Sequence, residues 1–123
     1  MSYKSAIEAA GAKVLEFSTF GSWQGEWVAL VEYKGEVGWV QGSFGSCSHC
    51  DAFESEFGLG LDEESETEVQ YQARLASFGE SYLGGLMTTE LAAKYFDGAA
   101  EWDTDSAGAA EWIRETGASF QVQ

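Results

Sequence analysis

The chain has 123 residues, enough for one domain with a hydrophobic core, and its 45% hydrophobic content argues against disorder over most of its length. Twenty-one acidic residues against six basic ones give a net charge of −15. This charge disfavours direct binding to nucleic acid or anionic membranes, because contacts to phosphates require cations. No stretch approaches the roughly 20 apolar residues of a membrane span, and the amino terminus lacks the apolar core of a secretory signal. We therefore expect a single cytoplasmic domain over residues 1–123.

The amino-terminal half predicts one helix and an antiparallel hairpin. In residues 3–15, apolar positions recur at spacings of three and four, as on one face of a helix. Residues 16–20 predict a strand beside the hairpin. The clearest alternation lies in residues 27–40, with a turn at Lys34-Gly35-Glu36. In its first strand Trp27, Ala29, Val31 and Tyr33 share one face, and Val28 and Leu30 share the other.

The remaining segments predict helices. Residues 51–57 suit a short helix, and residues 88–96 suit another that starts at Thr88 or Thr89. A longer helix is expected over residues 66–78, with Ser65 or Thr67 as its cap and with Val69, Ala73 and Ala76 facing inward. The last is expected over residues 105–116, ending near Gly117. The predicted fold class is therefore α+β, with a small antiparallel hairpin-centred sheet packed against three to four helices.

The pentapeptide GAAEW occurs twice, at Gly98–Trp102 and Gly108–Trp112. Five residues are too few to establish a duplication, and two copies do not form a solenoid. We interpret both tryptophans as anchors of the core or of an interface.

The only histidine, His49, lies between the only cysteines, Cys47 and Cys50. A structural zinc site needs four ligands; Asp51 or Glu54 could add an oxygen, and a homodimer, which the sequence leaves open, could add a second cysteine pair. A thiol redox site lacks the βαβ unit that such motifs accompany. We favour two buried thiols beneath a Gly-Ser turn, and we expect no cofactor. A zinc-binding or thiol interaction module stays as the alternative.

Other chemical motifs are incomplete. The acidic residues from Asp103 onward have the glycine of a calcium-binding loop, but Ala107 and Arg114 occupy positions that require oxygen donors. We find no Walker motif, and no nucleophile or orienting acid can be assigned to His49. We therefore expect a protein that is not an enzyme.

The acidic residues fall into two groups. No Lys or Arg occurs from Gly35 to Ala73, and a second acidic group occupies residues 97–115. Carboxylates along one exposed ridge resemble a row of phosphates and could occupy a cationic groove of a nucleic-acid-binding protein, with Phe57, Tyr71 or Trp102 as apolar anchors. The candidate partner-binding residues are Asp62, Glu63, Glu64, Glu66, Glu68, Asp103 and Asp105.

Two blocks carry a resemblance: GSWQGEW at Gly21–Trp27 and GSFGSCSHCDAFESEF at Gly42–Phe57. Together with the hairpin between them, they resemble a group of small, uncharacterised phage-encoded proteins with a Gly-Ser-Cys-Ser-x-Cys-Asp pattern, in which His49 replaces a smaller residue. The resemblance implies a phage context, in which small acidic proteins often block host machinery and some anti-CRISPR and anti-restriction proteins mimic nucleic acid. It favours a host-directed inhibitor over a small phage structural or regulatory protein.

Overall fold

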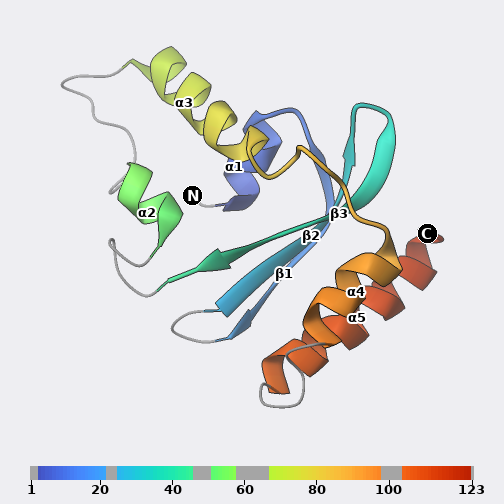
Figure 1. The fold of residues 1–123 in the computed structure, drawn as a ribbon. Coiled ribbons are helices and arrows are strands. Elements are labelled where there is room, and N and C mark those ends of the chain that lie inside the picture. Colours follow the sequence, from blue (N-terminus) through green and yellow to red (C-terminus); the bar gives the residue numbers. More distant parts are fainter. Residues whose placement is uncertain (1–2, 22–24, 46–50, 58–66, 98–103, 123) are drawn as a thin grey trace.

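A computed structural model describes residues 3–21, 25–45, 51–57, 67–97 and 104–122 (Figure 1). Its centre is an antiparallel sheet of order β1-β2-β3, formed by β1 (Lys13–Gly21), β2 (Gly25–Tyr33) and β3 (Glu36–Phe44). One face is covered by α1 (Tyr3–Ala9), α2 (Ala52–Phe57) and α3 (Glu68–Glu80), and the other by α4 (Thr89–Asp97) and α5 (Thr104–Phe120). The predicted α+β class is confirmed.

The β2–β3 hairpin closes through a two-residue turn. Tyr33 pairs with Glu36, and the intervening Lys34 and Gly35 have φ angles of 52° and 82°. Two consecutive residues with positive φ are typical of a type I′ turn, whose twist matches that of the flanking strands. Glycine adopts this conformation without steric cost, which explains why the Lys-Gly pair was a reliable sequence signal.

The first helix is shorter than predicted. It ends at Ala9, and the chain enters β1 at Lys13 instead of remaining helical to residue 15. Gly11 has a φ of 104° and donates to Glu8 O at 3.0 Å, and Ala12 donates to Ile7 O at 3.0 Å. These two hydrogen bonds form a Schellman motif, which ends the helix at a left-handed glycine. The apolar spacing that suggested a longer helix included a residue of β1.

The face covered by α1–α3 has an aromatic core. The β2 residues predicted to share one face lie here, with Trp27, Ala29 and Val31 fully buried and Tyr33 half-buried. The ring of Tyr3 stacks on Trp27 at 5.3 Å between centroids and contacts the ring of Phe78 at 6.0 Å. Rings from α1, α3 and the sheet therefore fill this layer.

The predicted inward face of α3 is wrong at two of its three residues. Val69 is 79% exposed and Ala73 is exposed, whereas Ala76 is half-buried and Leu75 and Gly79 are buried. A Cβ atom added to Gly79 would lie 2.0 Å from Ala6 O, so α3 approaches the backbone of α1 at the position that has no side chain. This close contact sets the rotation of α3. The predicted cap Thr67 is confirmed, with a complete capping box.

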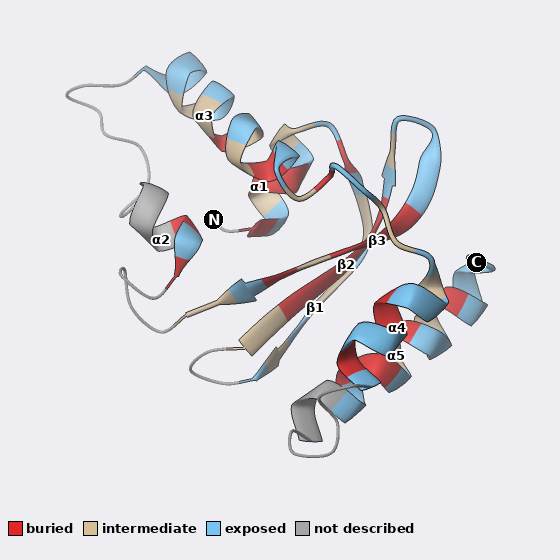
Figure 2. Cartoon of the chain, in the orientation of Figure 1, coloured by how far each residue is buried: buried red, intermediate tan, exposed pale blue. Residues whose placement is uncertain are grey.

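The opposite core combines alanines of the helices with larger side chains. Val28, Leu30 and Trp39 pack against α4 and α5, which contribute Ala92, Ala93, Phe96, Ala109, Ala110 and Ile113. Figure 2 shows exposed positions on the outer sides of both helices. The side chain of Trp112 is half-buried and lies 5.6 Å from the Trp39 ring, which supports a core role; the first GAAEW copy lies outside the described residues.

The last helix is longer than predicted. It continues to Phe120, so Gly117 lies inside α5 and does not end it. A Cβ atom at Gly117 would lie 2.5 Å from Thr89 Cγ2, so glycine is required here for close packing of α5 on α4. Helix α4 begins as predicted, because the Oγ1 atom of Thr88 accepts a hydrogen bond from the Leu91 amide at 3.2 Å.

Candidate partner-binding surface

The structure describes two of the seven candidate acidic residues. Glu68 lies exposed in the first turn of α3, and Asp105 lies in the first turn of α5. These helices cover opposite faces of the sheet (Figure 1), so these two residues lie in different layers. The other candidates lie outside the described residues: Asp62, Glu63, Glu64, Glu66 and Asp103.

The first acidic group leads into a well-defined helix terminus. Thr67 Oγ1 accepts from the Gln70 amide at 3.2 Å, and the Thr67 amide donates to Gln70 Oε1 at 2.9 Å. Glu68 accepts from Gln72 Nε2 at 3.0 Å, and its carboxylate lies at the positive end of the helix dipole. The acidic stretch that precedes α3 is therefore attached to a rigid, capped helix end.

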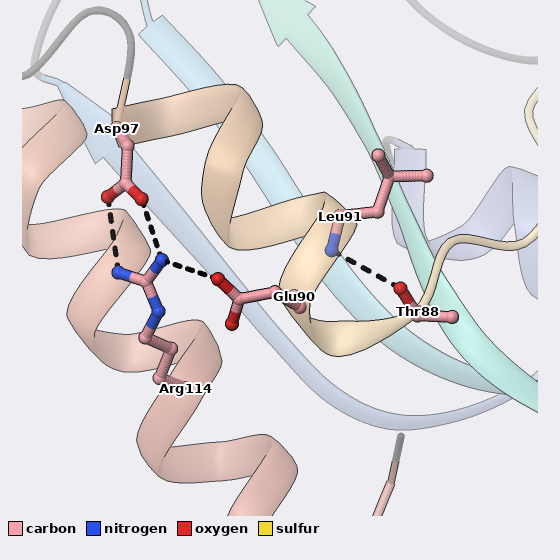
Figure 3. A network of polar contacts seen from close by, with 5 residues as sticks. All are labelled: Thr88, Glu90, Leu91, Asp97 and Arg114. Atoms are coloured by element: carbon pink, nitrogen blue, oxygen red, sulfur yellow. Dashed lines mark hydrogen bonds and ion pairs between the residues drawn. The ribbon is translucent and has the colours of Figure 1, made fainter.

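Two acidic residues of the second layer are held by a cation. Arg114 on α5 donates to both carboxylate oxygens of Asp97 on α4, at 3.1 and 2.6 Å, and to Glu90 at 3.1 Å (Figure 3). The hydrogen bonds from Arg114 hold the pKa of Asp97 below its usual value. Bidentate pairing fixes the geometry of this cluster, which joins the outer sides of α4 and α5. Both carboxylates are already paired, so they contribute less to an external field.

Other basic side chains lie over aromatic rings of the same chain. The guanidinium of Arg74 lies 4.5 Å from the centre of the Phe57 ring and 5.9 Å from that of Tyr71. The ammonium of Lys34 lies 5.2 Å from the centre of the Tyr33 ring. These are distances for cation–π contacts. The predicted aromatic anchors Phe57 and Tyr71 are thus engaged with Arg74, and Trp102 lies outside the described residues.

A buried carboxylate closes the segment that contains the cysteines. Asp51 is 5% exposed, and its Oδ1 atom accepts from Tyr3 Oη at 2.7 Å and from the Gly45 amide at 2.9 Å. The Tyr3 hydroxyl accepts from the Phe53 amide at 3.2 Å. Burial, followed by the hydrogen bond to Asp51, raises the pKa of Tyr3 above its usual value.

This cluster joins the two described residues on either side of the cysteine segment, because the Gly45 amide donates to Asp51. Cys47, His49 and Cys50 themselves lie outside the described residues. Asp51, considered above as a zinc ligand, instead has Oδ1 committed to two donors. The described residues contain no cluster of three or more potential metal ligands.

A groove lies at the turn end of the hairpin. Two adjoining depressions of about 400 and 380 Å³ share Glu36 and Leu86 in their walls. They lie between the β2–β3 turn and the segment that joins α3 to α4. The lining also includes Lys34, Glu80 and the exposed glycines Gly84 and Gly85. Sequence reasoning did not predict this groove, because it depends on where the α3–α4 connection crosses the sheet.

That connection crosses the outer edge of β3 at one residue. The Trp39 amide donates to Met87 O, and the Met87 amide donates to Trp39 O, both at 2.9 Å. In addition, Trp39 Nε1 donates to Thr89 Oγ1 at 2.9 Å, and Thr89 Oγ1 donates to Val122 O at 2.9 Å. The amino terminus of α4 and the end of α5 are therefore attached to β3 through one indole.

Comparison with known proteins found no matching family model, no matching curated protein and no matching solved structure. Within the described ranges, no helix has both the length and the apolar character that crossing a membrane requires.

Proposed function

We propose that this protein is a non-enzymatic, acidic binding protein of the cytoplasm that occupies a basic surface on a nucleic-acid-handling protein and competes with nucleic acid for it. The expected phage context would make it an inhibitor of a host process, of the kind that anti-CRISPR and anti-restriction proteins exemplify. The contacting part is the acidic stretch at residues 62–68, attached to the capped start of α3.

The observation that carries this proposal is the excess of acidic over basic side chains. Of the six cations, Arg114 is paired with Asp97 and Glu90, whereas Arg74 and Lys34 lie over aromatic rings and keep their charge. With 21 acidic residues the net charge is −15. The exposed acidic side chains on the described surface include Glu8, Glu16, Glu32, Glu36, Glu68, Glu80, Glu111 and Glu115. A field of this sign attracts basic partners and increases their association rate at low salt.

The positions of Glu68 and Asp105 favour one of the two acidic groups as the contacting part. Glu68 and Asp105 cannot both contact one flat basic surface, because their helices lie on opposite faces of the sheet. The group at residues 62–68 has no basic residue nearby in the sequence, whereas Arg114 is bonded within the second group. The first group is therefore the stronger candidate for contact.

The test uses two charge-reversal variants with the same change in net charge. One carries Glu63→Lys, Glu64→Lys and Glu66→Lys, and the control carries Glu8→Lys, Glu16→Lys and Glu111→Lys at exposed positions. Immobilised wild-type protein should retain a basic protein from host lysate at low salt and release it to a double-stranded DNA oligonucleotide. The first variant should lose the captured protein at an unchanged melting temperature, and the control should keep most of it. Equal loss in both variants, or retention that DNA does not reverse, contradicts the proposal.

A further inference from the structure

Among the described residues, only Met87 pairs with the outer edge of β3. Because Trp39 exchanges both main-chain hydrogen bonds with Met87, alternate residues of β3 direct their amide and carbonyl groups away from β2. The next two such residues are Gln41 and Ser43. Among the described residues, neither has a main-chain partner on that side. The Met87 bridge shows that this edge accepts main-chain pairing.

Helix α4 runs over β3 with an apolar flank beside this edge. Leu91 and Tyr95 are 57% and 52% exposed, although the buried residues of α4 include Phe96 at 2%. Glu90 and Asp97 face Arg114 on the α5 side, and the Leu91 side chain points away from them (Figure 3). The apolar flank therefore lies on the side of α4 that α5 does not cover.

The spacing along the helix matches the spacing along the strand. Residues four apart on a helix are separated by about 6 Å along its axis. Alternate residues of a strand are separated by about 6.8 Å. Leu91 and Tyr95 are thus placed to contact two successive same-face side chains of a strand paired with Gln41 and Ser43.

A carboxylate lies at the far end of the same region. Glu26 pairs with Ser43 across β2 and β3, and its Oε1 atom accepts from Ser43 Oγ at 3.2 Å. Partial burial, and then the negative charge of Glu26, raise the pKa of the Tyr95 hydroxyl, in agreement with a position near this carboxylate. Glu36 lines the groove at the other end. Glu26 shares the α4–α5 face with Val28 and Leu30, whereas Glu36 lies beyond the crossing at Met87.

We propose that the β3 edge and the Leu91–Tyr95 flank of α4 bind an extended segment of a partner protein in which basic and apolar residues alternate. The segment adds a strand to β3: its main chain pairs with Gln41 and Ser43, its apolar side chains contact Leu91 and Tyr95, and its cations project from the opposite face of the added strand. The net charge of −15 attracts these cations. This mode is strand addition at a sheet edge. The inference rests on the proposed function only for the sign of the partner's charge.

The test uses three synthetic peptides of about eight residues, the usual length range of a strand. One alternates lysine and valine; the second has proline in place of valine and keeps the charge; the third has glutamate in place of lysine. Fluorescence anisotropy should detect binding of the Lys-Val peptide only. NMR hydrogen exchange should show new protection of the Gln41 and Ser43 amides. Equal binding of the proline peptide would mean attraction by charge only and would overturn the proposal.

Two variants locate the site. Leu91→Gln with Tyr95→Gln should weaken Lys-Val binding at least about tenfold, since it removes the apolar contacts. Val69→Gln on α3, at a more exposed valine in the other helical layer, should leave binding unchanged. Equal effects of both variants, protection of other amides, or pairing of β3 with a second copy of this chain would contradict the assignment. If the Lys-Val peptide does not bind but charge reversal at Glu63, Glu64 and Glu66 abolishes partner binding, only this site is contradicted. The proposed function would then stand.

Discussion

The two faces of the sheet are packed in different ways. On the α1–α3 face, aromatic rings from five elements contact one another, and a buried hydrogen-bond cluster joins Tyr3, Asp51 and Gly45. On the α4–α5 face, alanines and Gly117 allow two helices to approach closely, and Trp39 fixes them to the sheet. The first layer gains stability from large apolar surfaces and the second from close backbone approach.

The largest difference in stability between the two faces should come from substitution of their buried glycines. Gly79→Ala should lower the free energy of unfolding by about 3 kcal/mol, because the new methyl meets the rigid main chain of Ala6. Gly117→Ala should cost about 1–2 kcal/mol, since the Thr89 side chain can turn away but then loses its bonds to Trp39 and Val122. Urea denaturation measures both values.

Gly108→Ala is the matched control for these glycines. It lies exposed in α5 with open space around its Cβ position. Removing a helix-interior glycine should therefore stabilise the protein by about 0.5–1 kcal/mol. If Gly79→Ala stabilised the protein in the same way, the close contact between α1 and α3 would be wrong.

A smaller effect should come from the buried hydroxyl of the aromatic face. Tyr3→Phe should cost about 1–3 kcal/mol, because Asp51 loses a donor while it remains buried. Tyr82→Phe removes a neighbouring hydroxyl for which the described residues supply no hydrogen-bond partner, so it should cost less. Thermal and urea denaturation at neutral pH would compare the two. Equal costs would show that the Tyr3–Asp51 bond adds little.

The same hydroxyl predicts a dependence on pH. The pKa of Tyr3 is raised in the folded state above the ordinary value of 10.0, so the unfolded chain loses this proton first as the pH rises. The contribution of Tyr3 to stability should be complete below pH 10 and should decrease as the pH rises above it. Denaturation at a series of alkaline pH values should show a shallower decrease for Tyr3→Phe than for the wild type.

The smallest effect should come from the exposed cluster between α4 and α5. Arg114→Gln removes the hydrogen bonds that keep the pKa of Asp97 low, so that pKa should rise toward its usual range. NMR titration of the Asp97 carboxyl measures the shift. The melting temperature should decrease slightly at low salt and not at high salt, because exposed ion pairs are screened. Lys94→Gln, which removes a weaker influence on Asp97, should shift the pKa less.

Local sequence patterns predicted those helices and strands that are specified by a few neighbouring residues. The β2–β3 hairpin followed from alternation and a Lys-Gly turn, and the starts of α3 and α4 followed from Thr67 and Thr88 as caps. The end of α1 was missed because the apolar spacing continued past Gly11 into β1, although the left-handed glycine ends the helix. A glycine in a helical pattern was the available signal, and it should have outweighed the spacing.

Features that depend on distant contacts could not be predicted in this way. The inward face of α3 is set by contact with Ala6, more than seventy positions earlier in the chain. The hydrogen bond of Tyr3 to Asp51 joins residues 48 apart. The outer edge of β3 depends on strand order and on the crossing at Met87, and neither is written in the local pattern. The acidic composition predicts a partner of positive charge. Only the fold shows that Glu68 and Asp105 lie in different layers.

The placement of the tryptophans has a practical consequence. Trp27 and Trp39 are both fully buried, one in each core, and they lie on different strands. Replacing the remaining tryptophans together with one of these two would leave a single fluorophore that reports on one layer only. The emission of each such variant during stopped-flow refolding would then show whether the two sides of the sheet assemble in one cooperative event or one after the other.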